Sequence, residues 1–169
     1  MCFLRICSPV SAQIINSIAG RKALEIIMQN EFRLTVSSKS VNEGFARVVV
    51  SAFAAPLDPT LEELADLKTA VSEAVTNCIV HGYKDRYGKI YITGRIDGST
   101  VKIIIRDKGC GIENIEQAMT PLFTTGEGER AGLGFTVMES FCDKVTVRSK
   151  SGAGTSVTLV KNIEGKSKW

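Results

Sequence analysis

The chain has 169 residues, of which 44% are hydrophobic and 23% are charged. This length predicts one domain with one core, since two ordinary domains need a longer chain. The 21 basic and 18 acidic residues leave a formal net charge of +3 and are spread along the sequence. This balance argues against direct nucleic-acid binding and favours a folded partner or a small molecule.

The cysteines and the apolar runs indicate the cellular compartment. The five cysteines are an odd number, with no Cys-x-x-Cys pair or Cys/His cluster that could hold a metal. We therefore expect reduced thiols in a cytoplasmic protein. Polar residues interrupt every apolar run before the roughly 20 residues that a membrane span needs, so no membrane partner is expected.

The N-terminal segment differs from the rest of the chain. Residues 1–27 contain a short apolar opening, Pro9 and an amphipathic stretch, without a convincing signal peptide. We expect a weakly ordered extension over residues 1–27 and a single domain over residues 28–169, with Met28 as a possible working start.

The first half of the domain predicts one strand and two helices. Phe32 to Ser37 alternates apolar and polar residues, which is typical of a strand, and we expect it at a sheet edge. A helix follows Ser40 and stops at Pro56, with Arg47 pointing away from its apolar stripe. The stripe consists of Val41, Phe45, Val48, Val49 and Ala52.

A long helix comes next. Thr60 and Glu63 have the spacing of a capping box at its start. Its apolar face comprises Leu64, Leu67, Val71, Val75 and Cys78. We expect the helix to end near His81 and Gly82, with Gly82 as a left-handed cap.

The second half predicts two hairpins around a third helix. Strands are expected over 89–96 and 100–106, joined at Asp97-Gly98, and over 144–149 and 155–160, joined by residues 151–154. The helix is expected over 133–141, and residues 108–131 have no clear periodicity. The order of elements predicts an α+β fold: a two-layer α/β sandwich with helices on one face of a mixed, mostly antiparallel sheet.

Asp107 is the strongest anomaly in the sequence. The alternation of the preceding strand directs it into the core, where an unpaired carboxylate would be costly. It therefore either pairs with a basic or backbone group or accepts a hydrogen bond from a ligand. Gly109 and Gly111 follow it and would let a flat ligand approach the backbone.

Two further groups could bind a nucleotide. Gly132, Leu133 and Gly134 open a helix whose free amides suit a phosphate, and the Walker and dinucleotide fingerprints are missing. Glu73 and Asn77 share the polar face of the long helix, where they could simply meet water or could orient a hydroxyl and hold Mg²⁺. We interpret His81, the only histidine, as a structural residue at a helix end.

Taken in order, these motifs resemble the four ATP-site boxes of the gyrase, Hsp90, histidine-kinase and MutL superfamily, whose fold is the Bergerat type. The motifs are Glu73-x-x-x-Asn77, Asp107-x-Gly109-x-Gly111, Gly132-x-Gly134 and Gly154-Thr155. The stretches 71–77, 81–83, 121–125 and 129–130 more closely resemble the anti-sigma-factor serine kinases of spore-forming bacteria. The likeness covers about residues 28–161.

The resemblance implies a role for each motif. Asp107 would bind the adenine amino group with Thr155 nearby, Asn77 would ligate Mg²⁺, and Glu73 would polarise the serine hydroxyl of a protein substrate. Arg130 would contact the γ-phosphate of ATP. The remaining positions of the implied ATP site are Gly109, Gly111, Thr124, Thr125, Gly132, Leu133 and Gly134.

The resemblance also implies protein partners. These are a sigma factor held inactive, an anti-anti-sigma protein phosphorylated on serine, and a second copy of the chain in a homodimer. Arg47 matches a partner-contact position. The alternatives are a general-stress type of anti-sigma kinase, a non-catalytic module that uses ATP to shape its partner surface and, least favoured, the ATP-binding part of a histidine kinase.

Overall fold

The computed structural model describes residues 29–120 and 133–165, so the expected N-terminal extension lies outside the described residues. The elements follow the predicted order, with two additional short helices, η1 and α5. Their bounds are β1 Gln29–Ser37, α3 Val41–Ala54, η1 Ala55–Leu57, α4 Leu61–Asn77, η2 Cys78–Tyr83, β2 Lys89–Asp97, β3 Thr100–Arg106, α5 Ile115–Met119, α6 Gly134–Phe141, β4 Lys144–Lys150 and β5 Gly154–Asn162.

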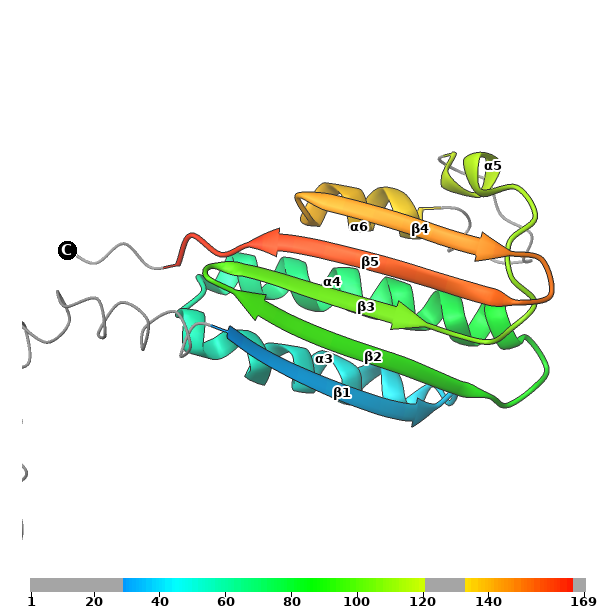
Figure 1. Ribbon diagram of the computed structural model, residues 1–169, viewed down its shortest axis with the longest axis horizontal. Helices are drawn as coiled ribbons and strands as arrows, with labels where there is room; N and C mark the ends of the chain where they lie inside the picture. Colours follow the sequence, from blue (N-terminus) through cyan, green and yellow to red (C-terminus); the bar gives the residue numbers. More distant parts are fainter. Residues whose placement is uncertain (1–28, 121–132, 166–169) are drawn as a thin grey trace, which may run out of the picture.

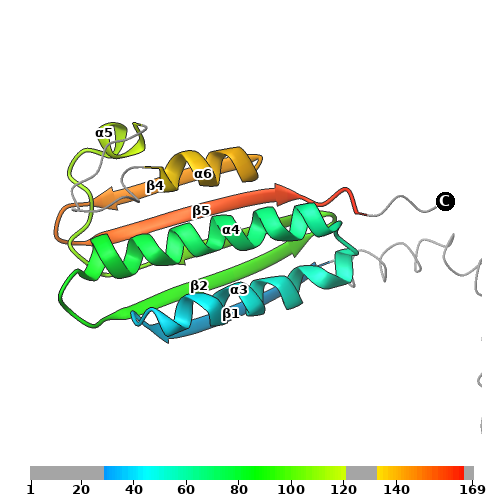
Figure 2. The same cartoon turned by 180° about the vertical axis from the view of Figure 1, so that it is seen from behind.

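The strands form one sheet in the order β1-β2-β3-β5-β4, and β1 lies at an edge as expected. Figures 1 and 2 show that α3, α4 and α6 cover one face of the sheet, and no element of the described residues covers the other. The predicted two-layer α+β sandwich is therefore confirmed. All four pairings among the described strands are antiparallel, so the parallel component allowed by a mixed sheet is missing from this part of the chain.

The core lies between α4 and the sheet. Four of the five residues expected on the apolar face of α4 are buried, namely Leu67, Val71, Val75 and Cys78, and Leu64 packs against them. The inward residues Ile103 and Ile105 of β3 are fully buried opposite them. The strands and α4 thus bury the faces that their sequence periods predicted.

The apolar stripe predicted for α3 is wrong. Val41, Phe45 and Val48 are 75%, 51% and 65% exposed, and the helix instead buries Ala46, Val50 and Ala54. These small side chains let α3 lie close to α4 and the sheet, which the larger residues of the stripe would prevent. Among the described residues, the stripe on α3 is exposed and does not belong to the core.

The end of the long helix also differs from the prediction. After Asn77 the backbone continues as a π-helix, η2, and the left-handed φ of 49° falls at Lys84. Gly82 has no positive φ among the backbone angles of the described residues. An ideal Cβ on Gly82 would instead lie 3.1 Å from the Asp107 carboxyl group. Gly82 therefore permits a close approach to Asp107 and does not act as a left-handed cap.

The capping box at the start of α4 is confirmed. The Thr60 hydroxyl accepts from the Glu63 amide at 3.1 Å, and the Thr60 amide donates to the Glu63 carboxylate at 2.7 Å. Burial raises the pKa of Glu63, but hydrogen bonds from the Thr60, Glu164 and Gly165 amides outweigh it and leave the pKa below its usual value. This stabilisation is present above the unfolded-state pKa of Glu63 and is lost as the pH falls through the lower folded-state value.

The first testable prediction concerns this cap. Thr60→Ala removes one acceptor for the free amides of α4 and should lower the free energy of unfolding by about 1 kcal/mol. Thr69→Ala is the matched control, since Thr69 is exposed on the same helix and bonds only the Ala65 carbonyl within the described chain. Urea unfolding at neutral pH measures both variants. Equal losses would contradict the assignment of this stability to the cap.

Two further expectations concern the chain as a whole. The described cysteines Cys78, Cys110 and Cys142 are free thiols, as expected. Burial raises the pKa of the Cys142 thiol to about 11, so it stays protonated at neutral pH. Among the residues described, no helix is long and apolar enough to cross a membrane.

Candidate nucleotide site

Asp107 follows β3 and is buried, with 2% of its surface exposed. Its Oδ1 accepts from the Gly109 amide at 2.7 Å and from the Thr155 amide at 3.3 Å, while its own amide donates to the Thr155 carbonyl at 2.9 Å. The backbone partner considered in the sequence analysis is therefore present. Both backbone donors reach Oδ1, which leaves Oδ2 as the oxygen of this carboxylate that a ligand could use.

The segment after α4 forms one wall beside this carboxylate. Gly82 lies against it, and the Cys78 thiol is close enough for the Asp107 charge to act on it. Burial and then the Asp107 charge raise the pKa of Cys78 well above its usual value, so the thiol stays protonated at neutral pH. Sequence reasoning assigned Cys78 to the core and Gly82 to a cap. Neither periodicity nor spacing could have revealed their contact with Asp107.

Glu73 and Asn77 meet the first residue of α6. An ideal Cβ on Gly134 would lie 3.2 Å from Glu73 Oε2 and 3.4 Å from the Asn77 amide group. Both side chains are half-buried. The polar face of α4 therefore borders another helix, and the simple explanation that these residues only meet water no longer accounts for them.

These groups converge along one side of α4 and η2. Glu73 and Asn77 lie at the α6 end of this side, and Cys78 and Gly82 lie at the Asp107 end. Nine residues separate Glu73 from Gly82, which corresponds to roughly 13 Å at the usual helical rise. This spacing suits a long ligand with a charged end near Glu73 and a flat, hydrogen-bonding end near Asp107.

The glycines near Asp107 permit close backbone contacts. An ideal Cβ on Gly109 would lie 2.1 Å from the Gly82 carbonyl oxygen, and one on Gly111 would lie 2.1 Å from the Lys150 carbonyl oxygen. Gly111 also has a φ of 73°. Any side chain at either position would displace the backbone, so these glycines fix the Asp107 loop against η2 and the β4–β5 turn.

A hydroxyl network supports this loop from the other hairpin. Ser149 Oγ lies 2.9 Å from Thr155 Oγ1 and accepts from the Ile112 amide at 2.7 Å. The Tyr83 hydroxyl also supports the loop. It accepts from the Lys108 amide at 3.0 Å and donates to the Lys89 carbonyl at 2.5 Å. These bonds hold Thr155 next to Asp107, as the sequence motifs implied.

Several expected site residues cannot be located. Thr124, Thr125, Arg130 and Gly132 lie outside the described residues. Leu133 is the N-cap of α6 and is 45% exposed. No group of three or more His, Cys, Asp or Glu side chains within the described ranges could hold a metal ion.

Arg47 lies on α3 and His81 lies on η2. The Arg47 guanidinium is 44% exposed and pairs with Glu43 at 3.3 Å. Glu43 in turn accepts from the Ser72 hydroxyl, next to Glu73. Burial, and then the Lys84 charge, lower the pKa of His81, so its ring is neutral at neutral pH. His81 retains its structural interpretation, although not as a cationic helix cap.

Comparison with known proteins adds independent information. The family of histidine kinase-like ATPase domains matches residues 36–161. The anti-sigma F factor of Thermoanaerobacter sp. (strain X514) is 58% identical over 135 residues, covering 79% of this chain and 94% of that protein. The anti-sigma F factor of Anoxybacillus flavithermus is 57% identical over 138 residues, covering 80% and 94%.

A solved structure supports the fold. The RsbU and RsbW domains of Rv1364c from Mycobacterium tuberculosis match with a TM-score of 0.58 and 18% identity. The match covers 79% of this chain and 32% of that one. At this identity the likeness extends to the fold alone.

Proposed function

Since this chain belongs to the anti-sigma F factor family and contains a histidine kinase-like ATPase domain, we propose that this anti-sigma factor is also an ATP-dependent serine kinase. In this proposal it holds a sporulation sigma factor inactive and phosphorylates a serine of the anti-anti-sigma protein that opposes it. The observation that carries the proposal is the convergence of Glu73, Asn77 and Gly134 at one end of the α4–η2 side with Asp107 at the other.

The residues at the Asp107 end suit adenine. Asp107 Oδ2 would accept from the adenine amino group, while the Thr155 and Gly109 amides hold Oδ1 in position. Gly109 and Gly111 fix the loop that carries Asp107 against its neighbours, because any side chain there would meet the Gly82 or Lys150 backbone. A carboxylate already held by two amides needs little reordering to bind a ligand.

The residues at the Glu73 end suit phosphoryl transfer. When bound, ATP supplies the γ-phosphoryl group. The Asn77 side-chain oxygen would hold Mg²⁺, which characteristically takes few protein ligands and uses phosphate oxygens for the rest. Glu73 would accept the proton of the attacking serine hydroxyl, and the free amides at the start of α6 would face the phosphates. Phosphoryl transfer depends chiefly on such positioning and charge stabilisation.

The surroundings of Glu73 support a route for the protein substrate. Arg47 is half-exposed and connects through Glu43 to Ser72, the residue before Glu73. A partner bound at Arg47 would therefore lie close to the proposed base. The exposed stripe of Val41, Phe45 and Val48 next to edge strand β1 supports the proposed homodimer, because an isolated apolar stripe and an open sheet edge both favour a covering partner.

A phosphotransfer assay tests the proposed function. The protein is mixed with γ-labelled ATP, Mg²⁺ and the anti-anti-sigma protein, and the labelled residue is identified by mass spectrometry. We expect label on one serine of the anti-anti-sigma protein. A chain that binds the sigma factor in the presence of ATP but transfers no label would instead be a non-catalytic module. Label transfer to a general-stress antagonist alone would identify the other type of anti-sigma kinase.

A second prediction tests the adenine contact. Asp107→Asn keeps Oδ1 as an acceptor for the two amides but replaces Oδ2 with an NH₂ group that opposes the adenine amino group. ATP binding should weaken by about 1.5 to 3 kcal/mol, the value of a hydrogen bond to a charged group. Isothermal titration calorimetry measures this change. Asp97→Asn, on the exposed end of β2, is the control, and unchanged affinity in Asp107→Asn would exclude the proposed contact.

A further inference from the structure

The open face of the sheet is strongly basic. Strand alternation sends every second side chain away from the helices, and all the lysines and arginines at these positions and at the adjoining Lys108 are exposed. Figure 1 views the sheet from this open side. The nine residues are Arg33, Lys89, Arg95, Lys102, Arg106, Lys108, Lys144, Arg148 and Lys150. We refer to them as the basic sheet face.

The acidic residues on the same strand positions are too few to neutralise this face. They are Glu31 and Asp97. Glu31 pairs with Arg33 at 2.9 Å and with Arg95 at 2.8 Å. Within the described residues, the other seven basic side chains have no carboxylate within salt-bridge distance. The basic sheet face therefore carries a dense positive field that the described residues leave largely uncompensated.

The strand register increases the density of charge. Arg95 lies directly opposite Lys102 on the neighbouring strand, and like charges in this position destabilise a sheet. Arg106 and Arg148 both lie opposite Ser156, one on each side of β5. Such repulsion between folded-state neighbours would be relieved by an anion that contacts several of the cations together.

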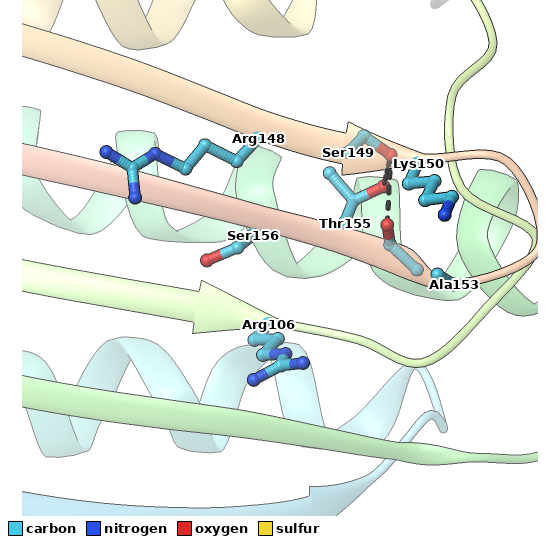
Figure 3. Close-up of a pocket in the computed structure, with 8 residues that line it drawn as sticks. Arg106, Arg148, Ser149, Lys150, Ala153, Thr155 and Ser156 are labelled. Atoms are coloured by element: carbon cyan, nitrogen blue, oxygen red, sulfur yellow. Dashed lines mark hydrogen bonds between the residues drawn. The ribbon is translucent and has the colours of Figure 1, made fainter.

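A hollow of about 300 Å³ lies at the β4–β5 end of this face. Arg106, Arg148 and Lys150 line it together with the hydroxyl residues Ser149 and Ser156. Figure 3 shows Arg148 and Arg106 on either side of Ser156, each from a different strand. Two guanidinium groups and hydroxyls around one hollow are well suited to a phosphate group.

The composition of the face favours a nucleic acid over a protein or a lipid surface. The residues between the cations include Thr93, Thr146, Thr158 and Ser156, which can donate to phosphate oxygens. The half-exposed Tyr91, Ile104 and Val160 lie among them. The large exposed apolar residues of the described chain lie on helices and loops and not on these strands, which disfavours insertion into a membrane. Protein interfaces are depleted in lysine, whereas nucleic-acid interfaces are polar and strongly positive.

We propose that the basic sheet face binds the sugar–phosphate backbone of DNA without regard to base sequence. This inference reverses the expectation from the net charge of +3, because that value averages over the whole chain. It does not depend on the proposed kinase activity, since the face lies on the opposite side of the sheet from α4 and Glu73.

Fluorescence anisotropy with a labelled DNA duplex of arbitrary sequence tests this proposal, using the full chain without ATP. Each lost phosphate contact reduces affinity on the order of tenfold at about 0.1 M salt and lowers the salt slope by about one. The double variant Arg106→Glu with Arg148→Glu should therefore bind at least about tenfold more weakly, with a shallower dependence on salt. The control is Lys68→Glu with Arg86→Glu, which makes the same charge change away from the sheet face.

The outcomes separate the possibilities. Binding by the wild-type chain that is weakened only in the sheet-face variant supports the proposal, and two different duplex sequences should bind equally. Equal weakening in both variants, or no binding at about 50 mM salt, would overturn it. Binding to phosphatidylglycerol vesicles but not to DNA would identify a membrane surface instead. Because the exchanged side chains of the sheet face are exposed, circular dichroism should show unchanged folding for these variants. The milder Lys102→Gln with Lys144→Gln provides a second variant.

Discussion

Glu73→Gln should reduce phosphoryl transfer to the anti-anti-sigma protein by about 10²- to 10⁴-fold, the usual contribution of a general base. Glutamine keeps the size of the side chain and its contacts with Gly134, but it cannot take the serine proton. Sigma-factor binding and ATP binding should stay within a few-fold of wild type. Single-turnover kinetics with γ-labelled ATP measure the chemical step directly.

The matched control for this prediction is Glu62→Gln, an exposed glutamate in the first turn of the same helix. Its transfer rate should be unchanged. If Glu73→Gln retained a rate close to that of the wild type, Glu73 would have no role as a base, although the ATP site could still exist. If both transfer and sigma binding were lost, Glu73 would instead support the fold.

Gly109→Ala should destabilise the whole domain. A methyl group at this position would lie 2.1 Å from the Gly82 carbonyl oxygen, which belongs to backbone and cannot rotate away. The Asp107 loop would have to move from η2, and the Cys110 amide would lose its 2.9 Å hydrogen bond to the same carbonyl. We expect a loss of about 3 kcal/mol or more, a large part of the stability of a domain.

Gly44→Ala is the control for this variant, because Gly44 lies in α3 and an added Cβ would meet nothing within 4 Å. Alanine favours a helix over glycine, so this variant should gain up to about 1 kcal/mol. Thermal unfolding and urea titration measure both changes. A stable Gly109→Ala protein with normal ATP binding would contradict the requirement for close approach between the Asp107 loop and η2.

The expected effects differ in what they report. Glu73→Gln tests chemistry and leaves the fold intact, whereas Gly109→Ala tests the backbone that brings the motifs together. Asp107→Asn tests the binding of ATP. A chain in which only Glu73→Gln gave the expected loss would still be a kinase, but its adenine would be bound elsewhere.

Much of the local structure follows from the sequence. Contacts between residues close in the chain, or the fixed period of a helix or strand, determine four of its features. These are the Thr60–Glu63 capping box, the buried face of α4, both hairpins and the inward direction of Asp107. Local geometry determines such features whatever the rest of the molecule does. The order of the motifs was likewise enough to predict the family.

Other features arise only when distant segments pack together. α3 has two faces that could be buried. It buries the face with the small residues Ala46, Val50 and Ala54, and not the larger apolar stripe, because α4 and the sheet approach it closely. A glycine suits position 82 because there is little room for a side chain beside Asp107, and not because the backbone has a left-handed φ. The role of Gly82 therefore depends on a residue 25 positions away.

The sequence by itself therefore determined the elements, their order and the kind of ligand that the motifs suit. The tertiary structure decided which helix face is buried, which groups surround the carboxylate and where the charges gather. The basic residues are spread along the chain, but antiparallel register brings them onto one open face of the sheet. Charge density is a property of distance in space, and separation in sequence does not report it.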